Sequence, residues 1–480
     1  MTKNHPVHKV PPADKVPFLT RIGWGFGGLA DNFMFNTMVA LGTLVYVNHF
    51  KLSPALAGMA LGLPRIIDAI TDPWIGNLSD NCKSRFGRRR PFMFWGVLLC
   101  TILLPMLWTV PMVETAANPW HSNVPFLYVV AVGSLLAISY TLFVVPYTAL
   151  GLELSPDYDE RTRVIKWRMY IGLAGSLAAA WLFRLASADR FPTLGQGAFW
   201  VTVGVAAIVL ISGMIPVASC RENLEVEEQE PIRLIPALVY TMTNRSFIIL
   251  FVSYVFVIVA IFSANGIAPL LMQHYVFGGD AKELGTFMGL LGTMAVALSY
   301  VSVFLIGFIS ERTSKRTAMI TGLVLAFMGI FLSYFAMDPR WPWAMYITNF
   351  IAFLGLQGCW LMVDSMVGDV CDDDELRSKR RREGMFSSVK GFGLKAAQGL
   401  TFGLGGYLAN VAGYNPAIVE AGGLAVDVAV KMKLLVVGLQ AGGLLLAIAA
   451  LYFYPITRAK AEETRRILDE RKNGDAAGAV

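Results

Sequence analysis

Charged side chains are scarce in this sequence. They make up 15% of its 480 residues, whereas ordinary soluble domains carry about 25%. Hydrophobic types reach 55%, and the mean hydropathy is positive at +0.55. That is more apolar surface than one water-soluble core can bury. The composition therefore argues against a single soluble domain and indicates a polytopic membrane protein.

Paired cysteines and an N-terminal apolar run are missing as well. The five cysteines stand singly, at Cys82, Cys100, Cys220, Cys359 and Cys371. Without paired spacing they favour neither a disulfide framework nor a zinc site. Residues 1–16 hold lysines and prolines but no apolar run, so we interpret them as a disordered cytoplasmic tail rather than a signal or anchor.

Apolar runs dominate the rest of the chain. A membrane-spanning helix needs roughly 20 apolar residues. This length gives twelve candidate segments, and the predicted fold is an all-α membrane protein of twelve transmembrane helices. The segments are 22–47, 54–78, 92–113, 124–150, 166–186, 198–218, 246–271, 284–309, 317–337, 342–368, 386–411 and 432–455.

Lysine and arginine are absent from the loops at 114–123 and 413–430, but they gather in the loops after even-numbered segments and in the tail at 457–480. The positive-inside rule then places both termini in the cytoplasm, with 457–480 as a cytoplasmic tail. The net charge is +6, but the cations are confined to short turns. This distribution argues against nucleic acid as a binding partner.

The longest polar insertion, at 221–245, divides the segments six and six. We predict an N-terminal six-helix bundle at 17–220 and a C-terminal one at 246–456. The insertion becomes a central cytoplasmic loop, within which residues 232–243 are expected to form a short surface helix.

A similar motif follows the second segment of each half. Gly76-x-x-x-Asp80 and Gly307-x-x-x-Glu311 both lead into a basic turn. The repetition favours an internal duplication of six-helix units, as in transporters with parallel repeats. The predicted fold is therefore two six-helix bundles.

The second segment carries three charges, Arg65, Asp68 and Asp72. Spacings of three, four and seven put them on one helical face. An aspartate at the bilayer centre costs roughly 2.5–3.5 kcal/mol. One arginine cannot neutralise two aspartates, which leaves a negative charge for a proton or for Na⁺, and Thr71 adds an oxygen ligand. The alternative is a purely structural ion pair with Arg65.

Lys395 lies in a four-residue stripe with Gly391, Gly399 and Gly403, which predicts a close helix contact. A lysine on such a face must pair, and the carboxylates of the second segment are the expected partners. The alternative is snorkelling to the interface. Asp31, a lone acid in the first segment, predicts a functional role unless it lies near the membrane surface.

The run Asp68-Ala-Ile-Thr-Asp72-Pro-Trp-Ile-Gly76, followed by Arg85-Phe-Gly-Arg-Arg-Arg-Pro91, resembles the signature of the glycoside–pentoside–hexuronide:cation symporters. These belong to the major facilitator superfamily. The resemblance extends to Tyr147-Thr-Ala-Leu-Gly-Leu-Glu153 and to the run from Asp369 to Glu375. It covers nearly the whole chain.

The resemblance implies two sets of binding residues. The cation-binding set is Asp68, Thr71, Asp72 and Thr141. The substrate-binding set is Asp31, Asn32, Tyr140, Arg168, Trp360 and Lys395. Val144 stands where the family carries a carboxylate for sugar hydroxyls, so the sequence favours the cation site more than a galactoside-type substrate.

A third set of charged residues is expected to form gating or structural ion pairs at the cytoplasmic side. It comprises Arg65, Asp80, Arg88, Arg89, Glu153, Arg161, Asp369, Asp372 and Glu375. Such networks break and reform between inward and outward states. The alternative is that the arginines act only as topology signals that attract anionic lipid.

The expected function is import of a sugar or glycoside, coupled to Na⁺ or H⁺, by a monomer in the cell inner membrane. A symporter of a non-sugar amphiphile such as a lysolipid is the alternative, and a non-transporting sensor is a further one. No nucleophile–base pair favours an enzyme, and no cofactor is expected beyond the coupling ion, with no metal site other than Na⁺ at Asp68 and Asp72.

Overall fold

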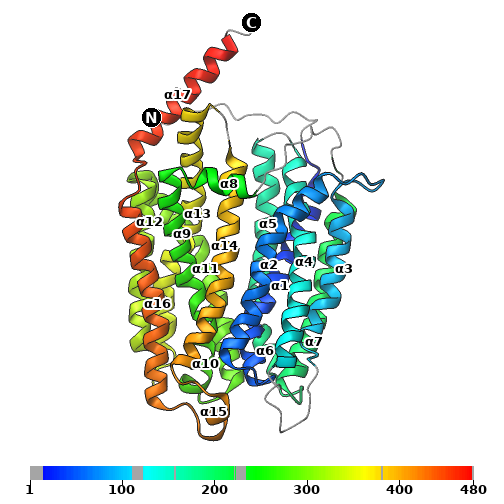
Figure 1. The fold of residues 1–480 in the computed structure, drawn as a ribbon, viewed down its shortest axis with the longest axis vertical. Helices are drawn as coiled ribbons and strands as arrows, with labels where there is room; N and C mark the ends of the chain where they lie inside the picture. Colours follow the sequence, from blue (N-terminus) through cyan, green and yellow to red (C-terminus); the bar gives the residue numbers. More distant parts are fainter. Residues whose placement is uncertain are drawn as a thin grey trace. The chain divides into compact units, whose positions relative to one another are not determined.

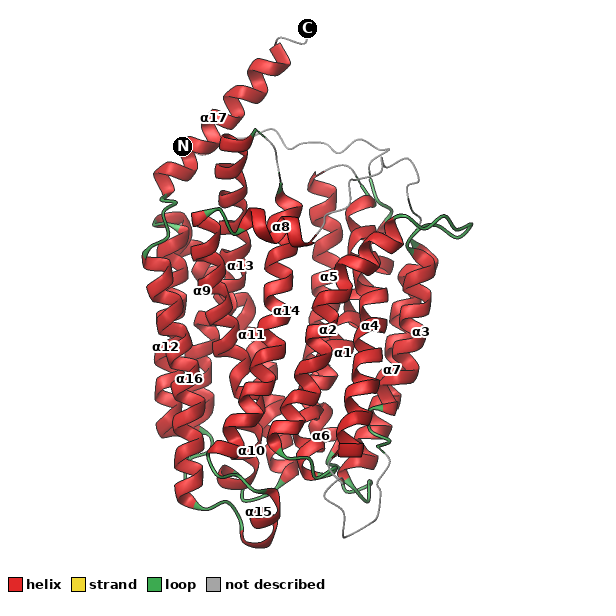
Figure 2. Cartoon of the chain, viewed as in Figure 1, coloured by secondary structure: helices red, strands yellow, loops and turns green. Residues whose placement is uncertain are grey.

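The computed structural model describes residues 15–110, 123–155, 158–220, 222, 234–379 and 382–477. Within these ranges every regular element is a helix and there is no strand (Figure 2). This confirms the all-α prediction. Residues 1–14 of the predicted tail and residues 221 and 223–233 of the central loop lie outside the described residues.

Each of the twelve predicted segments coincides with a helix in the described chain. These helices are α1 (Phe18–Asn48), α2 (Pro54–Asp80), α3 (Arg90–Met106), α4 (Asn123–Glu153), α5 (Tyr158–Ala179), α7 (Leu194–Ser219), α9 (Arg245–Phe262), α11 (Ala281–Arg312), α12 (Lys315–Ala336), α13 (Ala344–Ser378), α14 (Glu383–Val411) and α16 (Val426–Tyr452).

Short helices complete the fold (Figure 1). They are α6 (Leu182–Ala186), α8 (Leu234–Thr241), η2 (Ser263–Gly266), α10 (Ala268–Leu271), η3 (Met272–Val276), α15 (Pro416–Gly422) and α17 (Arg458–Ala477). The short helix predicted at 232–243 is confirmed by α8. Much of the tail at 457–480 forms α17, whose many charged residues gave no sign of a helix by hydropathy.

Eight of the described spans are long and apolar enough to cross a membrane: α4, α5 with α6, α7, α9 with its continuation to Val276, α11, α12, α13 and α16. The chain is therefore a multi-pass membrane protein. α3 is apolar but shorter, and α2 carries the charges that weaken its hydropathy.

Helix ends differ from the ends of the apolar runs for physical reasons. α3 ends at Met106, although the run continues to 113, because Pro105 occupies its last turn. α13 continues to Ser378, ten residues past its run at 342–368, since polar residues prolong a helix that hydropathy cannot follow. The start of α12 is fixed by Ser314, whose hydroxyl accepts a hydrogen bond from the Thr317 N–H.

The chain divides into two compact units. The first comprises Met1–Leu41, Thr71–Val110 and Ala131–Pro231, and the second comprises Gly42–Ile70, Pro111–Val130 and Ile232–Val480. In the first, α3 packs on α7; in the second, α12 packs on α13 and α9 on α16. The predicted division into bundles at 17–220 and 246–456 stays a prediction.

Within the second unit, α2 and α14 meet through glycines. A Cβ built on Gly406 would lie 2.0 Å from the Pro54 carbonyl oxygen, and one on Gly62 would lie 2.2 Å from that of Gly399. Of the predicted stripe, Gly399 and Gly403 lie at this contact, because the Cβ built on Gly62 would also lie 3.4 Å from the Gly403 backbone nitrogen. A Cβ on Gly391 or on Gly403 itself would meet no described atom within 4 Å. The close approach predicted for α14 is real, but it turns toward Gly406.

We predict that Gly406→Ala lowers the thermal unfolding midpoint of the purified protein, whereas Gly403→Ala on the same helix does not. The first substitution forces a methyl group into backbone atoms, at a cost of about 1–3 kcal/mol. The second adds a better helix former, worth roughly 0.5–1 kcal/mol, in open space. Equal midpoints for the two variants would contradict the glycine contact.

Candidate functional site

Asp68 is the most deeply buried carboxylate of α2, and its side chain has no exposed surface. In the second unit, Lys395 Nζ lies 3.0 Å from Asp68 Oδ2, and Arg65 Nη1 lies 3.7 Å from the same oxygen. The pairing expected for Lys395 is therefore present. The two cationic groups beside this buried carboxylate compensate its charge inside the protein.

Asp72 follows Asp68 by one helical turn on α2 and belongs to the first unit. Thr141 of α4, which is fully buried, donates its hydroxyl hydrogen to Asp72 Oδ1 over 3.2 Å. Thr71 lies beside Asp72 and is partly exposed. A carboxylate and a hydroxyl in contact are oxygen ligands of the kind that hard cations take.

Asp31 forms the polar centre of the first unit. Tyr140 Oη donates to Asp31 Oδ1 over 2.7 Å, and Arg168 Nη2 lies 3.0 Å from Asp31 Oδ2. The Arg168 guanidinium also lies 5.9 Å from the ring centre of Trp24 and 5.3 Å from that of Tyr147. The side chains of Asp31 and Arg168 are 16% and 30% exposed, so the pair is still reachable from outside.

Asn32 turns away from this cluster. Its Oδ1 accepts a hydrogen bond from Ser176 Oγ of α5 over 2.6 Å, while its Nδ2 donates to the Gly28 carbonyl oxygen. Of these two neighbouring residues of the predicted substrate-binding set, Asp31 supplies the charge of the cluster, while Asn32 bonds to α5 and to its own helix.

Trp360 of α13 lies in the second unit, where its ring packs edge-on against Tyr254 of α9 at 5.9 Å between ring centres. Asp364 follows one turn later on α13 and pairs with Lys390 of α14. The Asp364 side chain is 67% exposed. Sequence reasoning missed Asp364, although an acid four residues after Trp360 in an apolar run is a usable signal.

The turn between α2 and α3 holds a charge network in the first unit. Arg89 lies 2.7 Å from Asp80 and 3.0 Å from Glu153, and Arg88 lies 3.2 Å from Glu153. Burial raises the pKa of Glu153, and the two arginines oppose that shift. These residues meet as predicted for an ion-pair network, while their gating role stays a prediction.

Glu222, which was not predicted, binds the backbone of the same turn. Its carboxylate accepts hydrogen bonds from the backbone N–H groups of Arg88, Arg89 and Arg90 over 2.6, 2.8 and 2.9 Å. These groups open α3, where the helix dipole favours an anion. Nothing in the sequence distinguishes Glu222 from the other acids of its run.

At the end of α13, the predicted acidic residues have different surroundings. Lys315 lies 2.6 Å from Asp369. Two neighbouring carboxylates bind other groups: Asp373 pairs with Arg377 and Lys460, and Asp374 accepts a hydrogen bond from Tyr240. Asp372 and Glu375 share this partly exposed end of the helix. The side chain of Arg161 lies outside the described residues.

The Asp31–Arg168 pair should show energetic coupling in a double-mutant cycle of Asp31→Asn and Arg168→Gln. Because the pair is half-buried, we expect a coupling energy of about 1–2 kcal/mol in the unfolding of the purified protein. The exposed pair Arg458–Glu462 on α17 serves as the control, with an expected coupling of about 0.3–0.5 kcal/mol. Additive effects at Asp31 and Arg168 would refute the pair.

Comparison with known proteins shows the family of the chain. The family model described as MFS/sugar transport protein matches residues 23–458. An uncharacterized symporter of Synechocystis is 26% identical, covering 96% of this chain and 98% of the relative. The isoprimeverose transporter of Lactiplantibacillus pentosus is 23% identical over 84% and 83%. The sodium-dependent lysophosphatidylcholine symporter 1 of Gallus gallus is 24% identical over 88% and 83%.

Among solved structures, the chain is similar to a D-xylose-proton symporter with a TM-score of 0.61 and 16% identity, covering 91% of this chain and 97% of the other. At this identity the likeness supports the helical fold alone. The family model covers most of the sequence, including every residue of the two predicted binding sets. The chain therefore belongs to the MFS/sugar transport protein family, which confirms the family that its motifs resemble.

Proposed function

We propose that the protein is a secondary active symporter that takes up a sugar or glycoside by alternating access, driven by Na⁺ or H⁺. The observation that carries the proposal is the pair of carboxylates on α2. Asp68 is buried against Lys395, and Asp72 accepts a hydrogen bond from Thr141. Intramembrane acids in a family of transporters are expected to bind the coupled ion.

The two carboxylates have different roles in coupling in this proposal. Lys395 and Arg65 compensate Asp68 permanently. Asp72, with oxygen ligands from Thr141 and Thr71, takes the proton or Na⁺. Once the ion is bound, the face of α2 carries less net charge, which lowers the cost of changing its surroundings during alternating access.

The organic substrate uses the remaining polar clusters. In the first unit, Asp31, Tyr140 and Arg168 offer a carboxylate, a phenol and a guanidinium to the hydroxyl groups of a substrate. In the second unit, Trp360 offers a ring face of the kind that stacks on an apolar sugar face. The ion and the substrate favour the same occluded state, and each therefore raises the affinity of the other. The ion pairs around Arg88, Arg89 and Glu153 act as the cytoplasmic gate.

The proposal includes a place in the cell. The cation-rich turns and tail face the cytoplasm by the positive-inside rule, so both termini lie inside and the protein spans the inner membrane. In this proposal the protein works as a monomer.

The coupling is tested by Asp68→Asn and Asp72→Asn in proteoliposomes. Removing either charge should abolish ion-driven accumulation, with at least a tenfold loss of uptake. Asp72→Asn removes the proposed ion ligand, and Asp68→Asn removes the carboxylate with which Lys395 and Arg65 pair. Asp72→Asn should keep substrate exchange, which does not need the ion gradient. The exposed Asp427→Asn on α16 is the control and should transport normally. Full accumulation by both variants would overturn the mechanism.

The lysophosphatidylcholine relative favours one second candidate, uptake of a lysolipid-like amphiphile. Val144, which stands where a sugar-binding carboxylate is expected, is consistent with it. Thermal unfolding of the purified protein with a sugar panel and with lysophosphatidylcholine, each with and without Na⁺, separates the two. Binding raises the midpoint by mass action. Stabilisation by the lysolipid and by no sugar would replace the sugar proposal.

A further inference from the structure

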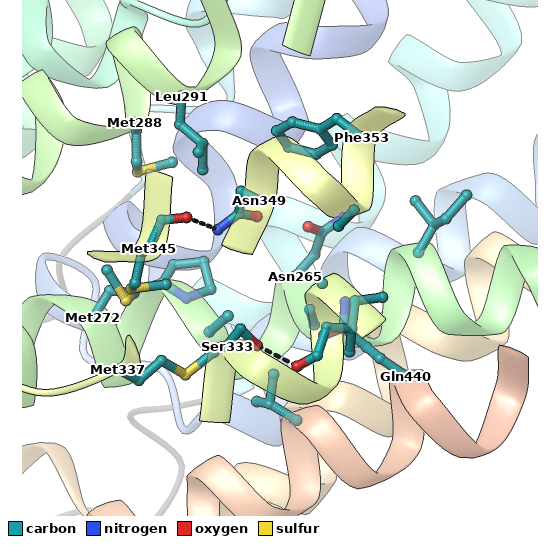
Figure 3. Close-up of a pocket in the computed structure, with 18 of the residues that line it drawn as sticks. Asn265, Met272, Met288, Leu291, Ser333, Met337, Met345, Asn349, Phe353 and Gln440 are labelled. Carbon is teal, nitrogen blue, oxygen red and sulfur yellow. Dashed lines mark hydrogen bonds between the residues drawn. The ribbon is translucent and has the colours of Figure 1, made fainter. Parts of the chain in front are cut away.

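The second unit contains a cavity of about 240 Å³ that no proposed substrate or ion residue lines. It lies among α9 with its continuation, α11, α12, α13 and α16. Four methionines surround it, Met272, Met288, Met337 and Met345 (Figure 3). The described residues that line it include no charged side chain.

Its few polar groups are uncharged. Ser333 donates to the Ile330 carbonyl oxygen over 2.6 Å, and Asn349 Nδ2 donates to the Met345 carbonyl oxygen over 2.8 Å. Each of these bonds joins two residues of the same helix, the first in α12 and the second in α13. The Asn349 amide oxygen can accept a hydrogen bond from a ligand hydroxyl, and the amide groups of Asn265 and Gln440 can accept from a hydroxyl or donate to an ether oxygen (Figure 3).

The volume and the lining suit one aromatic ring. A cavity of about 150 Å³ already takes up benzene in an engineered protein. Methionine sulfur makes favourable contacts with ring edges and adapts to different shapes. Phe287 and Phe353 add ring faces, and Phe287 already packs against Tyr346 at 4.8 Å between ring centres.

The cavity lies next to Trp360 along two helices. Leu356 lines it, and Trp360 follows four residues later on the same face of α13, about 6 Å along the axis. Ile261 also lines it, and Tyr254, which contacts Trp360, precedes it by seven residues on the same face of α9. The residues between Leu356 and Trp360 on α13, and between Tyr254 and Ile261 on α9, carry no charge.

We infer that this cavity binds an uncharged aromatic aglycone, so that the cargo is an aryl glycoside rather than a free sugar. The inference rests on the proposed function for the sugar part. It assigns the apolar half of the substrate to the cavity and the hydroxyl-bearing half to the neighbourhood of Trp360.

The test compares methyl and phenyl β-D-glycosides of galactose, glucose and xylose in binding to the purified protein in nanodiscs. For the sugar that binds, the phenyl glycoside should bind about ten- to a hundredfold tighter, as expected for burying one ring. Met288→Trp, which fills the cavity, should reduce that preference to about twofold or less and leave methyl glycoside binding unchanged.

Leu290→Trp is the matched control, because Leu290 lies two residues away on α11 and is 41% exposed. It should keep the full phenyl preference. Ala264→Leu fills the cavity from another helix and should act like Met288→Trp. Unchanged methyl glycoside binding shows that each variant is folded.

The outcomes separate the two proposals. Equal binding of methyl and phenyl glycosides by the wild-type protein, or a preference that survives both filling variants, would overturn the cavity assignment alone. Benzyl alcohol is a probe of the cavity without sugar. If it stabilises the wild type but not Met288→Trp, and no glycoside binds, the sugar proposal and the glycoside inference fall together.

Discussion

The cost of holding a carboxylate in an apolar interior governs the arrangement around α2. Asp68 has no exposed surface, so its charge must be compensated inside the protein. Lys395 of α14 supplies the compensation at 3.0 Å, and it does so only because the two helices approach closely. Gly62 faces Gly399 in that contact, where any side chain would meet backbone. The ion pair and the glycine contact therefore depend on each other.

The first unit meets the same cost in a different way. Asp31 is bound by an arginine and a tyrosine rather than by a lysine, and it keeps some exposure. Arg168 in turn rests on the faces of Trp24 and Tyr147, which stabilise a guanidinium that is only partly hydrated. A carboxylate held in this way can exchange a hydrogen bond with a ligand hydroxyl at small cost. That property suits a substrate cluster better than an ion site.

One face of α13 changes character along its length. Met345, Asn349 and Leu356 line an uncharged cavity, Trp360 follows, and Asp364 comes one turn later. These side chains, spaced four or seven residues apart, thus run from uncharged through aromatic to acidic. A ligand with an apolar and a polar end matches this order, which is the common physical basis of the glycoside proposal and of its amphiphile alternative.

Much of the fold could be predicted from sequence because hydropathy is local. Twelve apolar runs of sufficient length predicted twelve helices. Arg65, Asp68 and Asp72 indicated a polar face on one of them. The predicted pairing of Lys395 followed from the same reasoning, since a buried lysine needs a carboxylate. The end of α13 at Ser378 did not follow, because its last turns are polar.

Only the tertiary structure decided which partners meet. Glu222 accepts hydrogen bonds from three backbone N–H groups at the start of α3. It belongs to a run of similar acidic residues, and no spacing in the sequence distinguishes it from them. The choice of Asp31 over Asn32 depends on which side chain α1 turns toward Arg168. The sequence by itself determined the helices and the charges that need partners. Packing between distant segments determined which groups compensate them, because burial and distance are properties of the folded chain.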